Sequence, residues 1–571
     1  MAVAPGTEQM KVKKLNALTS LRFFAAALIV VHHSRGHFGV PIWINEYFPT
    51  YQGVAFFFVL SGFILTYVYQ SFHSMDQVKR FFVARIARVW PLHVVTLIIT
   101  LLLFHRHYMN ILAIPEKAKE FWTTLAANLF MVHGWIPLRD YFWSFNAPSW
   151  SISTEFGFYL LFPLLLAWLK RAWKLLLGLA FGVSVGVVLL CMILKLPASV
   201  THKGIGVVGV ININPLVRVF EFCVGMSACL FLGRFQARYR AGVVKGTLIE
   251  VGLVLAVVLF MSTNGWWMRT IHSFLGAAGM YWVGNGVLNS PFFAILILCF
   301  AVPRGLIAKA LCKRPFVLLG EISFSIYLLH HILIKLYEGL IEPIDSLPAP
   351  FSYLYFWAVL LAASYLLWTG IERPSRRAII KLATGNYHFQ NGGRYGNGFS
   401  PIRTGAALLI VGALITPVIF FVSNTPPICI IGKQEAHLIS LASYNKYKNI
   451  AFGEKFVLLS ADFIVDNNNT ELRLVWEAKE NTKLTMAVGV HFLDKDGNII
   501  GKTSYFQSQR IIGSYNVDKG TIWCDKVRVP REKLEHLKFV GICIYSWKRL
   551  LPISKGPRDW GGKRLLIKWP G

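Results

Sequence analysis

The sequence predicts an all-α bundle of about 10 to 11 transmembrane helices, followed by a small all-β, sandwich-like domain. Hydrophobic residues make up 55% of the 571 residues, and many apolar runs are long enough to cross a bilayer. Near the C-terminus these runs give way to short alternating apolar and polar stretches, as in half-buried strands. We therefore expect a polytopic membrane protein with an appended β domain.

The predicted spans follow from long apolar runs, and their orientation follows from the loops between them. The spans are 16–34, 52–71, 89–105, 149–168, 173–194, 215–233, 246–262, 284–303, 316–337, 351–371 and 404–422. Every second loop is rich in Lys and Arg, which predicts a cytoplasmic N-terminus and an extracytoplasmic C-terminus in the cytoplasmic (inner) membrane. Two more apolar segments, 122–134 and 268–283, are left unassigned as re-entrant or interfacial.

The chain carries a net charge of +30, which in a soluble protein would suggest nucleic acid. Here the basic residues lie mainly in short loops between spans, so we interpret them as topogenic charge that faces phospholipid. Nucleic acid is therefore not an expected partner. The eight cysteines show no metal-ligand spacing, and no metal is expected.

Composition divides the chain into four predicted segments. They are a membrane domain at 1–380, a basic cytoplasmic linker at 381–403, an additional transmembrane helix at 404–422, and an extracytoplasmic β-sandwich-like domain at 430–571. In the last segment Asp496-Gly497 is a hairpin-type turn signal between two apolar runs. One disulfide among Cys429, Cys524 and Cys543 is compatible with that location.

The first predicted span contains two polar residues, Arg22 and His33. Eleven helical residues turn through about 1100°, so both side chains lie on one face, about 16 Å apart along the axis. Ionisable groups inside a span usually face the bundle interior and mark a functional site. The pair predicts a polar track through the bilayer. Alternatively, Arg22 reaches a headgroup and His33 lies at the outer boundary.

Six blocks that follow in order point to a known family. They are GVAFFFVLSGFILTYVY (53–69), RFFVARIARVWPLHVV (80–95), APSWSISTEFGFYLLFP (147–163), PLVRVFEFCVGM (215–226), LLGEISFSIYLLHHILI (318–334) and SYLLWTGIERPSRR (364–377). Together with Arg22 and His33, they resemble the acyltransferase-3 family of membrane O-acyltransferases, which modify bacterial surface glycans. The resemblance covers residues 15–380, and residues 430–571 do not resemble the esterase-like domain of some members.

The resemblance implies an acyl-CoA donor, by default acetyl-CoA, bound from the cytoplasm, and an acceptor hydroxyl outside. The acceptor would be a surface polysaccharide or a lipid-linked glycan precursor. A family motif of Arg, ten residues and His falls on Arg22 and His33. We expect His33 to act as the base that activates the hydroxyl, a task that suits neutral imidazole. Arg22 would contact the thioester or pantetheine part of the donor, while His32 would be structural.

Glu155 is the second catalytic candidate, since it lies near the outer end of its predicted span, at a depth similar to that of His33. Its carboxylate would orient the imidazole, as triad acids do. The alternative is an internal salt bridge. Trp150 and Tyr159 flank Glu155 and are candidate acceptor-binding residues, although Trp150 is also compatible with an interfacial anchor.

Arg85 and Arg88 match a family motif of two arginines ahead of a proline, here Pro91. At i and i+3 they share a helix face at the predicted inner end of the third span. Paired guanidinium groups suit the phosphates of CoA. The alternative is that these arginines only set the membrane topology, as basic residues of cytoplasmic loops do. The family often has Tyr two residues after this proline, and here the residue is His93.

The remaining blocks supply weaker candidates. The family match emphasises Ser323, Tyr327 and His330, and His330 would assist transfer or line the CoA channel, unless it is a core histidine. Arg218 and Glu221, at i and i+3, are expected to pair with each other. Glu372, with Pro374, closes the last block at the inner surface and is expected to cap a helix or pair with loop arginines.

The leading prediction is therefore an acyl-CoA-dependent membrane O-acyltransferase that acts on a glycan hydroxyl at the outer face. The alternative is a transporter or flippase for a glycan or lipid-linked sugar, with the β domain as a glycan-binding module. Internal repeats and paired broken helices, which favour a transporter, are not evident. A mere membrane anchor for a glycan-binding module would not require Arg22 and His33 inside a span.

Overall fold

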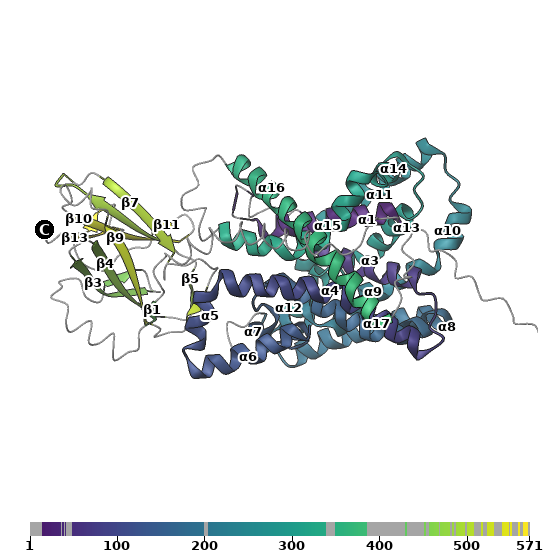
Figure 1. Ribbon diagram of the computed structural model, residues 1–571, viewed down its shortest axis with the longest axis horizontal. Coiled ribbons are helices and arrows are strands. Elements are labelled where there is room, and N and C mark those ends of the chain that lie inside the picture. Colours follow the sequence, from purple (N-terminus) through teal and green to yellow (C-terminus); the bar gives the residue numbers. More distant parts are fainter. Residues whose placement is uncertain are drawn as a thin grey trace, which may run out of the picture. The chain divides into compact units, whose positions relative to one another are not determined.

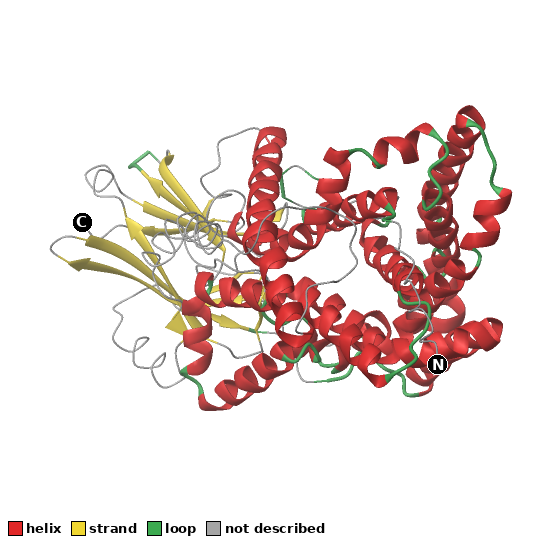
Figure 2. Cartoon of the chain, turned by 45° about the vertical axis from the view of Figure 1, so that its right-hand side comes forward, coloured by secondary structure: helices red, strands yellow, loops and turns green. Residues whose placement is uncertain are grey.

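The computed structural model describes residues 14–35, 37–38, 40, 48–198, 204–337 and 349–384, and beyond them the strands and short turns named below. Two compact units emerge, residues 1–334 with 347–416, and residues 335–346 with 417–571. The described part of the first unit consists of helices joined by short loops, and the strands belong to the second unit (Figures 1 and 2).

The helical unit contains long helices and short connecting turns. The α-helices are α1 (Asn16–His33), α3 (Gly53–Val68), α4 (Met75–Leu103), α5 (His105–Leu112), α6 (Pro115–Leu129), α7 (Arg139–Phe142), α8 (Trp150–Ile193), α9 (Pro215–Leu230), α10 (Leu232–Arg238), α11 (Val243–Ser262), α12 (Asn264–Gly284), α13 (Ser290–Phe300), α14 (Leu306–Leu311), α15 (Arg314–Leu336), α16 (Ala349–Leu367) and α17 (Arg373–Thr384). The 3-10 helical turns are η1 (Thr50–Gln52), η2 (His133–Trp135) and η3 (Ala147–Ser149). The π-helical turns are η4 (Val208–Ile213) and η6 (Trp368–Glu372).

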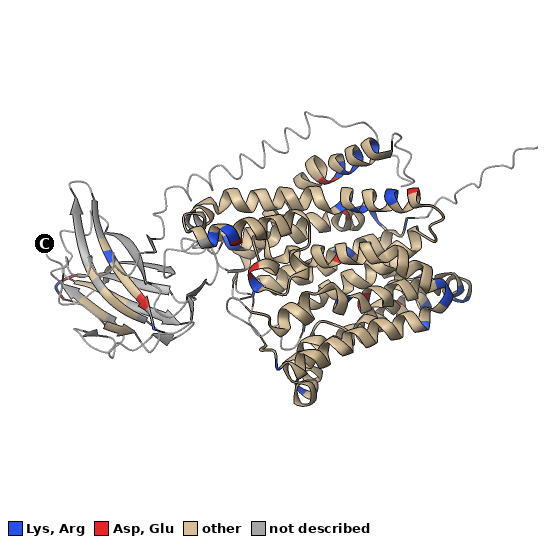
Figure 3. Cartoon of the chain, turned by 90° about the horizontal axis from the view of Figure 1, so that it is seen from below, with Lys and Arg blue, Asp and Glu red and all other residues tan. Residues whose placement is uncertain are grey.

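Among the described residues, seven helices are long and apolar enough to cross a membrane. They are Thr50–Val68, Met75–Leu103, Ala147–Ile193, Val208–Leu230, Val243–Ser262, Arg314–Leu336 and Pro350–Ala383. Long stretches of the helices in this unit contain no Lys, Arg, Asp or Glu, as the tan ribbon in Figure 3 shows. The described part of this unit is therefore mostly helical, as predicted, with seven candidate membrane-spanning helices.

The count of seven is lower than the predicted 10 to 11, for physical reasons that differ between segments. Predicted spans 149–168 and 173–194 form one long element, α8, kinked at Ala172 (φ −152°, ψ 56°). In 284–303 only the 11 residues of α13 are regular, about 16 Å of helix and too short to cross. Helix α1 has 18 residues, but its polar side chains lower its mean hydropathy. Residues 404–422 lie outside the described part.

Helix α4 begins much earlier than the predicted span 89–105. The side chain of Ser74 accepts a hydrogen bond from the backbone N–H of Gln77, which caps the first turn, and Asp76 favours the helix N-terminus. Pro91 lies inside the helix without ending it. Arg85 and Arg88 therefore lie about three turns from the first residue of α4.

Helices α3 and α9 are in backbone contact at two glycines. A Cβ atom at Gly62 would overlap the carbonyl group of Phe222, and one at Gly225 would overlap that of Val59. Only glycine permits so close an approach. The adjoining core is formed by apolar side chains of α1, α3, α9 and α13, among them Ala55, Val59, Phe63, Val224 and Ile297. This close packing fixes the wall of the site described below.

The second unit contains strands. They are β1 (Cys429–Ile430), β2 (Ile450–Phe452), β3 (Phe456–Asp466), β4 (Asn469–Ala478), β5 (Thr482–Leu484), β6 (Ala487–Leu493), β7 (Ile499–Phe506), β8 (Tyr515–Val517), β9 (Ile522–Val529), β10 (Phe539–Ser546), β11 (Arg549–Leu550), β12 (Arg558–Asp559) and β13 (Arg564–Lys568). One sheet has the order β1-β9-β4-β3-β2, a second β12-β13-β10-β6-β7 with β11 on β10, and β5 pairs with β8.

Strands β6 and β7 pair antiparallel on either side of Asp496, where the sequence predicts a hairpin-type turn. Pairing of β1 with β9 sets the backbone of Cys429 opposite that of Cys524. The described C-terminal residues thus contain paired strands.

Candidate active site

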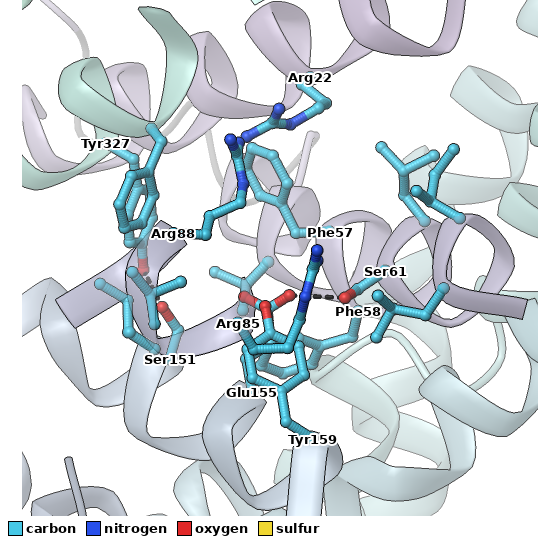
Figure 4. Close-up of a pocket in the computed structure, with 17 residues that line it drawn as sticks. Arg22, Phe57, Phe58, Ser61, Arg85, Arg88, Ser151, Glu155, Tyr159 and Tyr327 are labelled. Atoms are coloured by element: carbon cyan, nitrogen blue, oxygen red, sulfur yellow. Dashed lines mark hydrogen bonds between the residues drawn. The ribbon is translucent and has the colours of Figure 1, made fainter. Parts of the chain in front are cut away.

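A polar cavity of about 150 Å³ lies within the helical unit, between α1, α3, α4, α8 and α15 (Figure 4). Its polar lining residues are Arg22, Ser61, Arg85, Arg88, Ser151, Glu155, Tyr159 and Tyr327. Its apolar lining includes Phe57, Phe58, Ile64, Val89 and Phe324. We call this cavity the arginine pocket, since guanidinium groups from two helices converge there. Arg22, Arg85, Arg88, Glu155 and Tyr159 were all predicted from sequence, and the fold brings them together.

Arg22 projects from α1 into this pocket, toward Arg88 of α4 (Figure 4). Its charge is repelled by Arg88 and attracted by Glu372 and Glu155. Like charges held together in a low-dielectric interior are costly unless anions offset them. The arrangement therefore favours an additional anionic group in the pocket.

Arg88 is already engaged by an internal carboxylate. Its Nη1 lies 3.3 Å from Oε1 of Glu372, and Oγ of Ser325 donates to Oε2 of the same carboxylate across 3.3 Å. The side chain of Glu372 is only 3% exposed. The sequence predicts that Glu372 caps a helix or pairs with loop arginines, whereas the arginine bonded to it is Arg88, which lies within helix α4.

Arg85 has a different environment. Its guanidinium carbon lies 5.8 to 6.0 Å from the ring centroids of Tyr69, Phe81 and Tyr159, a cation–π arrangement. Its buried Nε has no hydrogen-bond partner among the described residues. A buried donor without an acceptor is costly, so an oxygen-bearing ligand in the pocket would satisfy it. Arg85 is thus the arginine best prepared for an external anion.

Glu155 of α8 lines the arginine pocket, as Arg22 does. Its Oε1 accepts a 2.5 Å hydrogen bond from Oγ of Ser61 on α3 (Figure 4). The sequence predicts a depth similar to that of His33; of the two residues, Glu155 is the one that lines this pocket in the described part of the chain. The difference arises because the part of α8 that carries Glu155 packs beside the arginines of α4, a relation that the sequence pattern does not contain.

Tyr327 of α15 forms the edge of the pocket nearest the histidines. Its hydroxyl lies 2.6 Å from Oγ of Ser151 and donates to the carbonyl oxygen of Pro148 across 2.9 Å. Its ring centroid is 5.8 Å from that of His330, one turn further along α15. Trp150, by contrast, packs against an apolar cluster that includes Phe142 and is not a described lining residue.

His33 and His330 meet across α1 and α15. Nε2 of His330 lies 3.0 Å from Nδ1 of His33, and His330 is fully buried. The two helices are held close because a Cβ atom at Gly320 would overlap the carbonyl group of Thr19. Arg22 and Tyr327 line the pocket, Tyr327 neighbours His330, and His330 contacts His33, so we refer to these four residues as the polar track.

Several residues and contacts of the site were not predicted from the sequence. Ser61 and Ser151 lie within blocks that resemble the family, yet nothing in their own spacing singles them out. The contact between His33 and His330 joins residues 297 positions apart. The expected pair of Arg218 and Glu221 is confirmed, with Nε and Oε1 2.7 Å apart. Within the described residues, no group of three or more His, Cys, Asp or Glu is arranged to hold a metal ion.

Comparison with known proteins finds relatives that are named acyltransferases or O-acetyltransferases. Acyltransferase MdmB of Streptomyces mycarofaciens is 29% identical over 409 residues, 65% of this chain and 93% of that protein. Putative peptidoglycan O-acetyltransferase YrhL of Bacillus subtilis is 26% identical over 63% of this chain and 54% of its own length. O-acetyltransferase OatA of Staphylococcus aureus is 25% identical over 64% and 57%.

The chain thus spans little more than half the length of the last two relatives. No solved structure matches it. The model of the acyltransferase domain matches residues 15–372, which include every residue of the arginine pocket and both histidines. Because this match covers well over half of the chain, the protein belongs to the acyltransferase-3 family.

Proposed function

We propose that this protein is a membrane O-acyltransferase that transfers a small acyl group, by default acetyl, from acyl-CoA to a hydroxyl of a cell-surface glycan or its lipid-linked precursor. The observation that carries the proposal is the convergence of Arg22, Arg85 and Arg88 in one pocket on the track that leads to His33. Such an arrangement suits an anionic donor whose reactive end must reach a base.

The donor is a substrate, and the residues of the pocket fit part of it. Arg85, with its unpartnered Nε, and Arg88 would hold phosphate oxygens. A cavity of about 150 Å³ is of the size that holds a benzene-sized group. It would therefore take one portion of the donor, while the nucleotide extends beyond it. Arg22 would guide the pantetheine or thioester part, and Glu155 with Tyr159 would balance and hold the arginines.

The proposed transfer is a single displacement. Neutral His33 takes the proton of the acceptor hydroxyl as the oxygen attacks the thioester carbonyl carbon. The C–O bond forms, the C–S bond breaks, and the thiolate of CoA takes the proton from the imidazolium. The products are the O-acyl glycan and CoA, and no other reactant is consumed.

The location of the acceptor is inferred from charge and from relatives. YrhL and OatA are named O-acetyltransferases, and the name of YrhL specifies peptidoglycan. The alternation of basic loops supports a cytoplasmic N-terminus in the inner membrane. We propose that residues 1–380 form the catalytic membrane domain, that 381–403 and 404–422 are a linker and a further span, and that 430–571 form a β-sandwich on the acceptor side.

One assay tests this function. The full chain in lipid nanodiscs is incubated with radiolabelled acetyl-CoA and one acceptor at a time. The acceptors are peptidoglycan fragments, a lipid-linked precursor and a surface polysaccharide. We expect label on the sugar that mild alkali releases, as it does from an ester. Label that resists alkali would indicate an amide, and failure to bind acetyl-CoA would contradict the proposed donor. His33→Ala serves as the catalytically impaired control.

A further inference from the structure

The contact between His33 and His330 has a defined pattern of hydrogens. Nδ1 of His330 lies 3.3 Å from the carbonyl oxygen of Ile326, one turn earlier on α15. A carbonyl oxygen only accepts, so this nitrogen of His330 carries the hydrogen. In the neutral ring, Nε2 of His330 then has the lone pair and acts as an acceptor.

The same reasoning applies to His33. Its Nδ1 lies 3.1 Å from the carbonyl oxygen of Ile29 and 3.0 Å from Nε2 of His330. Both neighbours are acceptors, so Nδ1 of His33 carries the hydrogen and donates it. The lone pair of the neutral His33 ring is thereby assigned to Nε2, the nitrogen that a general base would use.

We propose that His330 is a positioning residue for His33: it fixes the tautomer and the ring orientation that let His33 take the acceptor proton at Nε2. This inference rests on the proposed function. His330 replaces the carboxylate that performs this task in catalytic triads. It also supports the imidazolium that forms during transfer, because the Nδ1–H of a charged His33 donates more strongly to the neutral ring. Of the roles that the sequence suggested for His330, this one gives a specific form to the assistance of acyl transfer and differs from lining the CoA channel.

The surroundings favour a pair of neutral rings. His330 is fully buried, and the rings of His32 and His331 lie 4.9 and 5.3 Å from that of His33. A second positive charge in this histidine cluster would be opposed by the first. Tyr327, beside His330, contributes a neutral hydroxyl that is bonded to Ser151 and Pro148. Close packing of Gly320 on Thr19 holds the helices in place.

The test compares three variants of the full chain. His330→Gln keeps an acceptor near the position of Nε2, and His330→Leu removes it. His93→Leu is the control, since His93 is also buried and bonded, to the carbonyl oxygen of Asn128, but lies on α4. We expect His330→Leu to lower kcat of acyl transfer about 10- to 100-fold, below the full loss of a base, with little change in the KM for acyl-CoA. His330→Gln should restore most of the rate.

Two readouts separate positioning from simple support of the fold. The acidic limb of the kcat/KM profile against pH should move in His330→Leu and stay in place in His330→Gln and His93→Leu. In ¹⁵N-histidine spectra of the wild-type protein, assigned with His33→Ala, Nδ1 of His33 should be protonated and Nε2 should not. The spectrum keeps the test decisive even if His330→Leu does not fold.

Three results would overturn the inference. They are protonated Nε2 in the resting His33, unchanged kcat and pH profile in a folded His330→Leu, or a rise in the KM for acyl-CoA with constant kcat, which would make His330 a donor-binding residue. None of these removes the proposed function. Full transfer activity in His33→Ala would instead contradict the base assigned there. Loss in His33→Ala/His330→Leu should equal that of His33→Ala alone, since the residues act as a unit.

Discussion

The arginine pocket and the pair of His33 and His330 lie along the same helix, α1, but they are built on opposite principles. The pocket gathers charges that offset one another, with Arg88 bonded to Glu372 and Arg85 enclosed by aromatic rings. The histidine pair consists of two imidazoles joined by one hydrogen bond. Charge suits the retention of an anionic donor, and a neutral ring suits the movement of a proton. In the proposed function, the arginine pocket would therefore bind the donor and the histidine pair would carry out the chemistry.

The largest effect that separates the two regions is expected at His33. His33→Ala removes the proposed base and should lower acyl transfer by about 10²- to 10⁴-fold. Binding of CoA should change little, because His33 is not among the described residues that line the arginine pocket. Transfer rate and CoA affinity are measured on the same folded preparation. An equal loss in both quantities would mean that the two regions are one site.

An intermediate effect is expected at Arg85. Arg85→Ala removes the guanidinium with the unpartnered Nε and should weaken CoA binding by about 1.5–3 kcal/mol, the range for hydrogen bonds to charged groups. Arg80→Ala is the matched control, since Arg80 is exposed on the same helix and pairs with Asp76. Titration calorimetry with CoA measures both. Equal affinity in wild type and a folded Arg85→Ala would return Arg85 to a purely structural role.

The smallest effect that we predict concerns the stability of the fold, separately from any contact of Arg88 with the donor. Arg88→Ala leaves the carboxylate of Glu372 buried without Arg88, which should cost about 2 kcal/mol, less than the 3–5 kcal/mol of a fully buried pair because Arg88 is 21% exposed. Thermal unfolding in detergent measures the loss. Arg88→Ala/Glu372→Gln should recover most of it, since the charge that lacks a partner is then gone. If the double variant were as unstable as Arg88→Ala, the ion pair would not be the cause.

Residue spacing predicted the track but not the way its members pair. Arg22 and His33 share a face because eleven residues make about three helical turns, which is a local property of one helix. Resemblance to the family added Glu155, Arg85 and Arg88, and these three line one pocket. The contacts of Glu155 with Ser61, and of His33 with His330, join distant helices. Such contacts depend on which faces pack together, so no single segment contains them.

The fold shows the same division between local and distant information. Apolar runs predicted most of the helices, because bilayer thickness and residue type act segment by segment. Helix α4 starts earlier than the predicted span 89–105. The apolar run favoured that span, although Ser74 and Asp76 are helix-start signals. The kinked continuity of α8 at Ala172 was missed because Lys170, Arg171 and Lys174 indicated a loop there. Hydropathy alone does not separate a loop from a kink.

The glycine contact between α3 and α9 bears on how the protein can move. With Gly62 against Phe222 and Gly225 against Val59, a shift of one helix by a single residue would drive a side chain into a carbonyl group. These two helices therefore cannot slide past each other, and they move, if at all, as one body. Since α3 supplies Ser61 to the arginine pocket, that wall stays fixed during turnover. In the proposed function, the acyl group would then travel on its donor, rather than being carried by a change in this wall.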